Sequence, residues 1–279
     1  MGKTMDHYQE EYIPLIEEFV TQVEQSGVQT DGIPEPHLPV IGKNYEQCKY
    51  KIAFFGIDTK GWNELSDFII DWHSDPQQAL YGWKKPLDEM EYLKWCNNFH
   101  TSFWDFVIQF LCEFYHISSP EEYENYADIG TSFVWGNTNA IEKYDNVKDS
   151  GVKEEDYDIV KNYSRIFDSA DHVLKPIRPN VLIVLNWSEA EEWLTKFEDK
   201  SDVLRIELDT HLLYYYIRSS NTHVFWTAHP RWLSKEIHTM ITKIIQKIRE
   251  YNVWDILPEK PSDWCLPMSQ DSNQNTSHR

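Results

Sequence analysis

Three separate stretches of the chain place a polar side chain directly after a run of strand-forming residues. Asp58 follows the first run, Asn137 and Asn139 follow the second, and His229 follows the last. A carboxylate can stabilise a nearby cation or orient water, an amide can donate and accept hydrogen bonds at once, and an imidazole can donate to a developing anion. We expect these groups to lie at one ligand site, because ligands of open α/β sheets bind where parallel strands end.

Each of these signals also has a purely structural interpretation. Asp58 would cap the turn that follows its strand, and either asparagine would favour a turn for conformational reasons alone. A site is therefore predicted only if the three stretches meet at one edge of one sheet, which requires parallel strands.

Five strand patterns alternate with helical patterns along the chain. The strands are expected at residues 52–57, 131–136, 181–185, 203–208 and 222–228, and the helices at residues 64–72, 88–115, 158–174, 188–197 and 234–251. The run Val181–Leu185 is apolar throughout, as is typical of a parallel strand covered on both faces. This alternation predicts an α/β fold with three layers, α/β/α, around a central and mostly parallel sheet.

The two ends of the chain differ from its centre. Residues 8–25 carry apolar side chains at spacings of three and four, so residues 1–34 are expected to form an amphipathic helix and a lead-in. Residues 35–258 form the α/β domain. Residues 259–279 are polar, and we expect this tail to be disordered.

Composition and charge restrict the kind of partner. The 279 residues include 26 basic and 46 acidic side chains, so the formal net charge is −20, which repels polyanions at long range. No apolar run approaches the roughly 20 residues of a membrane span, and the first residues lack the apolar core of a signal peptide. We expect a cytoplasmic protein that does not associate with membranes.

The cysteines and histidines show no metal-binding pattern. The four cysteines are far apart in the sequence, without a C-x-x-C pair, and the eleven histidines are scattered. We therefore expect reduced thiols, no metal and no cofactor.

Three segments, taken in order, resemble the signature segments of the uracil-DNA glycosylase superfamily. They are residues 55–61 (Phe-Gly-Ile-Asp-Thr-Lys-Gly), 134–139 (Val-Trp-Gly-Asn-Thr-Asn) and 226–231 (Trp-Thr-Ala-His-Pro-Arg). The resemblance spans residues 35 to 250. It implies that family's fold and the excision of a deaminated or damaged base, such as uracil, from DNA. Asp58 would then position the attacking water, an asparagine would read the base, and His229 would contact it.

The chemistry of N-glycosidic cleavage accounts for such a set of residues. Positive charge develops on the sugar, where Asp58 would stabilise it, and negative charge develops on the departing base, where His229 would donate a hydrogen bond. We favour Asn137 over Asn139 as the base reader, and Trp62, Phe99 and Phe103 are candidates for stacking on the base. The expected substrate-binding residues are Gly56, Ile57, Asn137, Asn139, Phe103, Trp62, Pro230 and Arg231.

Departures from the family pattern leave two functions open. Ile57 replaces a glutamine of the best-known branch and Arg231 replaces a serine, so the base need not be uracil. The cations of the last helical pattern form either a DNA-binding face or an ordinary solvated face; they are Arg231, Lys235, Lys243, Lys247 and Arg249. The first function is an active DNA glycosylase. The second is a non-catalytic protein of the same fold that binds a free base, a nucleotide or a basic protein partner.

Overall fold

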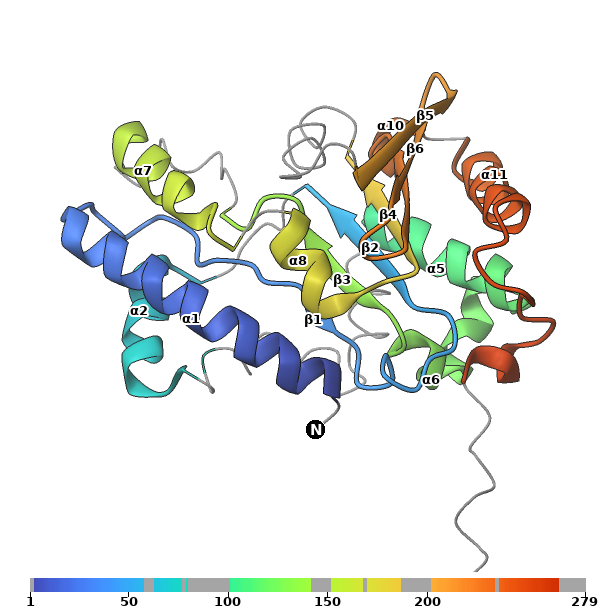
Figure 1. The fold of residues 1–279 in the computed structure, drawn as a ribbon, viewed down its shortest axis with the longest axis horizontal. Coiled ribbons are helices and arrows are strands. Elements are labelled where there is room, and N and C mark those ends of the chain that lie inside the picture. The colour runs from blue at the N-terminus through green and yellow to red at the C-terminus, as the bar shows by residue number, and fades with distance from the viewer. Residues whose placement is uncertain are drawn as a thin grey trace, which may run out of the picture.

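The computed structural model of the chain is described for residues 3–57, 63–76, 79, 101–141, 152–167, 170–186, 202–233 and 236–265. Its centre is a seven-stranded mixed sheet with the strand order β1-β3-β2-β4-β7-β6-β5 (Figure 1). The strands are β1 (Val40–Ile41), β2 (Ile52–Gly56), β3 (Val134–Asn137), β4 (Val181–Leu185), β5 (Val203–Asp209), β6 (Leu212–Ile217) and β7 (Thr222–Thr227). The chain therefore has an α/β fold.

Four adjacent strands, β3, β2, β4 and β7, are mutually parallel. Their residues are buried almost throughout, which explains why the sequence shows continuous apolar runs there. The carboxyl ends of all four strands therefore lie at the same edge of the sheet. This is the condition under which the polar residues that end or follow these strands could form one site.

The remaining pairings correct the prediction of a mostly parallel sheet. β1 is antiparallel to β3, β6 is antiparallel to β7, and β5 is antiparallel to β6. The sequence patterns above do not include β6, which lies between two short loops and makes β5, β6 and β7 consecutive hairpins. Since a hairpin joins antiparallel neighbours, one overlooked strand changed the expected direction of two pairings.

Helices lie on both sides of the sheet in Figure 1. The α-helices are α1 (Lys3–Ser26), α2 (Leu65–Ser74), α5 (Ser102–Tyr115), α6 (Ala127–Gly130), α7 (Glu154–Ser164), α8 (Ala170–Ile177), α10 (Pro230–Leu233) and α11 (Ile237–Glu250), and the 3₁₀ helices are η1 (Pro120–Asn125) and η5 (Pro261–Trp264). The single helix predicted over residues 158–174 is divided between α7 and α8. The helix predicted at residues 188–197, and residues 88–100 of the longest predicted helix, lie outside the described residues.

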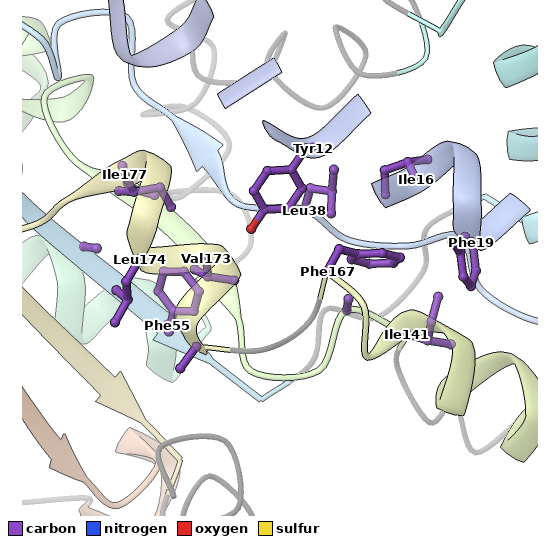
Figure 2. Packing of buried hydrophobic residues seen from close by; sticks show 14 of the residues in the cluster. Tyr12, Ile16, Phe19, Leu38, Phe55, Ile141, Phe167, Val173, Leu174 and Ile177 are labelled. Carbon is purple, nitrogen blue, oxygen red and sulfur yellow. The ribbon is translucent and has the colours of Figure 1, made fainter. Parts of the chain in front are cut away.

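Two hydrophobic clusters use alternate residues of the strands. In β2, Ala53 and Phe55 belong to one cluster, whereas Ile52 and Phe54 belong to the other. The first cluster also contains side chains of α1, α2, α7 and α8, and the second contains side chains of α5 and α11. Figure 2 shows part of the first cluster, which includes Tyr12 from α1, Leu174 from α8 and Phe55 from β2. The alternation follows from the two-residue period of a strand.

The C-terminal segment continues the fold further than we predicted. Residues 259–265, assigned to a disordered tail from the sequence, include η5 and an isolated β-bridge between Cys48 and Cys265. Within this segment, Trp264 packs against the second hydrophobic cluster, and its carbonyl oxygen accepts from the Lys49 N–H at 2.9 Å. Residues 266–279 lie outside the described part.

None of the described helices combines the length and the apolar character that crossing a bilayer would require.

Candidate functional site at the carboxyl ends of the parallel strands

The strand order reverses at one edge of the sheet. Along the chain the parallel strands come in the order β2, β3, β4, β7, but in space the order is β3-β2-β4-β7. The connection leaving β2 therefore runs to one side and the connection leaving β4 runs to the other. In open α/β sheets such a reversal leaves a crevice outside the carboxyl ends of the two strands, and ligands bind there.

Gly56, the last residue of β2, lies between an aromatic ring and an amide. A methyl group built on its Cα would lie 3.4 Å from the Phe103 ring and 3.4 Å from the Asn137 side-chain oxygen. Gly56 is not among the glycines with positive φ, so its backbone conformation does not require glycine. The missing side chain instead leaves bare backbone facing Phe103 and Asn137, which is a common use of glycine beside a ligand.

The start of α5 and two neighbouring indole rings hold Phe103 in place. It lies in the first turn of α5, which begins after Thr101, whose hydroxyl oxygen accepts from the Trp104 N–H at 3.4 Å. The ring of Phe103 meets that of Trp104 edge-on at 4.8 Å, and Trp104 meets Trp135 of β3 at 4.9 Å. The aromatic side chain beside Gly56 is thus supported by buried indoles.

Hydrogen bonds join the ends of the four parallel strands. Both the main-chain N–H and the hydroxyl of Thr138 donate to the Gly56 carbonyl oxygen, at 2.9 and 3.3 Å. The Asn186 amide donates to the Thr138 hydroxyl oxygen at 3.1 Å, and the indole N–H of Trp226 donates to the Asn186 carbonyl oxygen. Thr138 and Asn186 are both buried. This network joins the carboxyl ends of the strands to one another.

His229 follows β7 and has a defined tautomer. Its Nδ1 accepts a hydrogen bond from the Arg231 N–H at 3.1 Å, which satisfies a free N–H group in the first turn of α10. Burial, and then the charge of Arg231, lower the pKa of His229 below its ordinary value. The imidazole is therefore neutral near pH 7. Since Nδ1 is the acceptor, Nε2 carries the proton and can act as a donor.

The segment after His229 combines buried and exposed residues. Pro230 is buried, whereas Arg231 is exposed and Trp232 retains 81% of its accessible surface. Further along, Lys243 and Lys247 of α11 form ion pairs with Asp209 and Glu250, respectively. Two of the five cations that we considered for DNA binding are thus already paired with carboxylates of the chain.

The lead-in before β1 contributes two buried titratable residues. The Glu35 N–H donates to Asn63 O at 3.0 Å, beyond the end of β2, and the His37 N–H donates to Ala140 O at 2.7 Å, beyond the end of β3. Burial raises the pKa of Glu35 to about 7, against hydrogen bonds from Asn63 that lower it. Burial also lowers the pKa of His37 to about 3, so that this imidazole is neutral.

The structure brings several predicted residues to the same edge of the sheet. Gly56, Asn137 and Phe103 are neighbours, and Asn139 is joined to Ile57 by a main-chain hydrogen bond of 3.3 Å. His229, Pro230 and Arg231 follow β7 at that edge. Asp58, Trp62 and Phe99 lie outside the described residues, so the placement of the predicted acid and of two stacking candidates is not described.

Sequence reasoning missed two residues of the edge, Thr138 and Asn186. Asn186 comes directly after the apolar run Val181–Leu185, which is the same signal that singled out Asp58 and His229. Thr138 stands between the two asparagines that we considered, but only the cross-strand bonds reveal its role.

The described residues contain no group of three or more His, Cys, Asp or Glu side chains arranged to hold a metal ion. No family model matches the chain, and neither the curated proteins nor the solved structures contain a match to it. Its function must therefore be inferred from the site itself.

Proposed function

We propose that the protein is a glycosylase with a three-layer fold similar to that of the uracil-DNA glycosylases, and that it hydrolyses the N-glycosidic bond of a deaminated or damaged base. The base would enter the crevice beside Gly56. Phe103 would stack on it, and Asn137 would pair with its polar edge. His229 would donate from Nε2 to the base as negative charge develops there, and Asp58 would stabilise the sugar cation and orient water.

One observation carries this proposal: a bare glycine lies between an aromatic ring and a buried amide. The Phe103 ring and the Asn137 oxygen are both 3.4 Å from the position that a Gly56 methyl group would take. A flat heterocycle needs a ring to stack on and an amide to read its edge, and a residue without a side chain lets it approach the backbone.

The tautomer of His229 supports the same chemistry. A cationic imidazole would attract phosphates, but a neutral one with its proton on Nε2 can donate to a base oxygen without releasing a proton. Asn137 ends β3 and His229 follows β7; these strands are three positions apart in the sheet, which corresponds to about 14 Å at the usual strand spacing. One base and two side chains would fit within that width.

The charge distribution supports a second candidate function. A net charge of −20, together with the pairing of Lys243 and Lys247 within the chain, disfavours a long contact with duplex DNA. The same crevice would then bind a free base or nucleotide without cleaving DNA. The exposed Arg231, beside His229, would meet its phosphate.

A cleavage assay separates the two functions. Single-stranded and duplex oligonucleotides carrying uracil, hypoxanthine or an oxidised base are incubated with the wild-type protein and with Asp58→Asn, and abasic product is measured. We expect product with the wild type and strong loss of product with the variant. Product that is retained by both Asp58→Asn and Asn137→Ala would overturn the mechanism. A folded protein that gives no product but binds free nucleotides by calorimetry would instead establish the second function.

A further inference from the structure

Two free cysteines that are distant in the sequence face each other at the amino ends of the strands. Cys48 and Cys265 are partners in an isolated antiparallel β-bridge, and neither forms a disulfide in the structure. Cys48 is buried and Cys265 is partly exposed. The proposed function uses neither residue.

The hydrogen bonds around the bridge define the type of pair. The Lys49 N–H donates to Trp264 O at 2.9 Å, which joins the residue after Cys48 to the residue before Cys265. The Cys48 N–H instead donates to Asn44 O and Tyr45 O within its own turn. The two cysteines are therefore a non-hydrogen-bonded pair, the kind in which opposed Cα atoms approach to about 4.5 Å.

Such a pair has the geometry that a disulfide needs. Directly opposed residues of an antiparallel pair project their side chains on the same side, with Cβ atoms about 4.5 to 5.5 Å apart. A disulfide requires Cβ atoms about 3.5 to 4.5 Å apart and Cα atoms within about 7 Å. By these typical distances the two Cβ atoms would approach by about 1 Å, and the disulfide would replace the hydrogen bond from the Cys48 thiol to Tyr50 O at 3.1 Å.

We propose that Cys48 and Cys265 are a reversible disulfide site, oxidised by a low-molecular-weight disulfide such as oxidised glutathione. The partly exposed Cys265 thiolate attacks one sulfur of glutathione disulfide, forms a mixed disulfide and releases one glutathione thiol. Cys48 then attacks the Cys265 sulfur and releases the second glutathione, so that two protein thiols are oxidised and one external disulfide is reduced. Cys48 takes the second role because the β-bridge places it directly opposite Cys265, and its thiol loses a proton as it attacks.

The disulfide would hold a segment that the fold already positions. Trp254 meets the Tyr50 ring edge-on at 5.2 Å, the Tyr50 hydroxyl donates to Ile256 O at 3.1 Å, and the Trp254 indole donates to the Asn180 side chain at 3.2 Å. Asn180 directly precedes β4, so these contacts lie at the end of the strands opposite the candidate site. Oxidation would thus close a loop from residue 48 to residue 265 and stabilise the fold without changing the crevice.

The test compares reduced and oxidised forms of the full chain. The protein is equilibrated with reduced glutathione or with excess oxidised glutathione, remaining thiols are alkylated, and peptides are mapped by mass spectrometry without reduction. We expect a peptide linking Cys48 to Cys265, and a Tm higher by about 10 °C than that of the reduced form. Dithiothreitol should reverse both.

Two variants make the result decisive, each compared with its own reduced form. Cys265→Ser should lose both the link and the rise in Tm. Cys112→Ser should keep both, because the β-bridge pairs Cys265 with Cys48, whereas the Cys112 thiol donates to Ser119 O at 3.8 Å. An oxidised wild type without the Cys48 to Cys265 peptide, or with Cys265 linked mainly to Cys96, Cys112 or a second chain, would overturn the proposal. So would a link that leaves the Tm unchanged.

Discussion

The two ends of the parallel strands are both rich in polar residues, but they are built differently. At the amino end the polar groups bond to one another: the Thr222 hydroxyl donates to Pro179 O at 2.8 Å, and the Asn180 N–H donates to Lys51 O at 2.8 Å. The C-terminal segment then covers this end through Trp254. The contacts there account for structure alone.

At the carboxyl end the polar groups also bond to one another, but a second set of groups lies beside them. Thr138 and Asn186 join the strands, while Gly56, Phe103 and His229 add bare backbone, an aromatic ring and a neutral donor. The comparison teaches that buried polar residues after strands do not by themselves indicate a site. A glycine that exposes its backbone beside both an aromatic ring and an amide is the more specific sign.

The largest expected difference between the two ends comes from two histidines: His223, near the start of β7, and His229, just after its end. His223, at the amino end, is held by the Tyr214 hydroxyl at 2.8 Å, and burial lowers its pKa, as it does for His229. His229→Ala should reduce the rate of base excision by about 10² to 10³-fold, as the loss of one positioned donor does. His223→Ala should leave that rate unchanged. Single-turnover cleavage measures both, and equal losses would remove the distinction between the ends.

A pair of glycines tests the difference between a position with no room for a methyl group and a position with room for one. A methyl group on Gly136 would lie 2.6 Å from the Phe55 ring, so Gly136→Ala should destabilise the fold by about 1–3 kcal/mol. A methyl group on Gly56 would make only ordinary contacts, at 3.4 Å. Gly56→Ala should therefore fold with nearly wild-type stability but bind the base about 10-fold more weakly or worse.

Urea unfolding and ligand titration of both glycine variants provide the measurement. A Gly56→Ala protein with unchanged affinity would show that no ligand lies against this backbone, and it would return Phe103 and Asn137 to a structural role.

The hydrogen bonds at the carboxyl ends of the strands should contribute to stability at least as much as those at the amino ends. Asn186→Ala removes a buried amide that donates to Thr138, and we expect a loss of about 1–3 kcal/mol in the free energy of unfolding. Thr222→Val removes a buried hydroxyl bond at the amino end and should cost about 1 kcal/mol. Chemical denaturation compares the two; if Asn186→Ala has no effect, the network is not what holds the strand ends together.

The smallest net effect concerns pH, because Glu35 and His37 act in opposite directions. The folded pKa of His37, about 3, lies below the ordinary 6.5, so its contribution is complete above pH 6.5 and is lost as the pH falls, at up to about 1.4 kcal/mol per unit. The folded pKa of Glu35, about 7, lies above the ordinary 4.5, so its contribution is complete below pH 4.5 and is lost as the pH rises to 7. Between pH 5 and 6.5 the two effects offset each other.

Single substitutions should reveal how each residue changes the free energy of unfolding with pH. Glu35→Gln should become less stable as the pH falls from 6.5 to 5, whereas His37→Gln should become more stable over the same range. Thermal unfolding across that interval gives both slopes, and two variants with the same sign of slope would contradict the assignment of either pKa.

The sequence by itself determined the four buried strands and the polar residues that follow them. Both are local properties: a run such as Val181–Leu185 must be buried on two faces, and a polar residue directly after it must lie at the sheet edge. The tertiary structure alone decided that β6 makes the sheet mixed, that Thr138 bonds to Asn186, that Gly56 faces Phe103, and that Cys48 faces Cys265. These last three pairs join residues that are 47 or more positions apart, so no local pattern encodes them. They arise because the packing of the whole sheet sets which side chains meet.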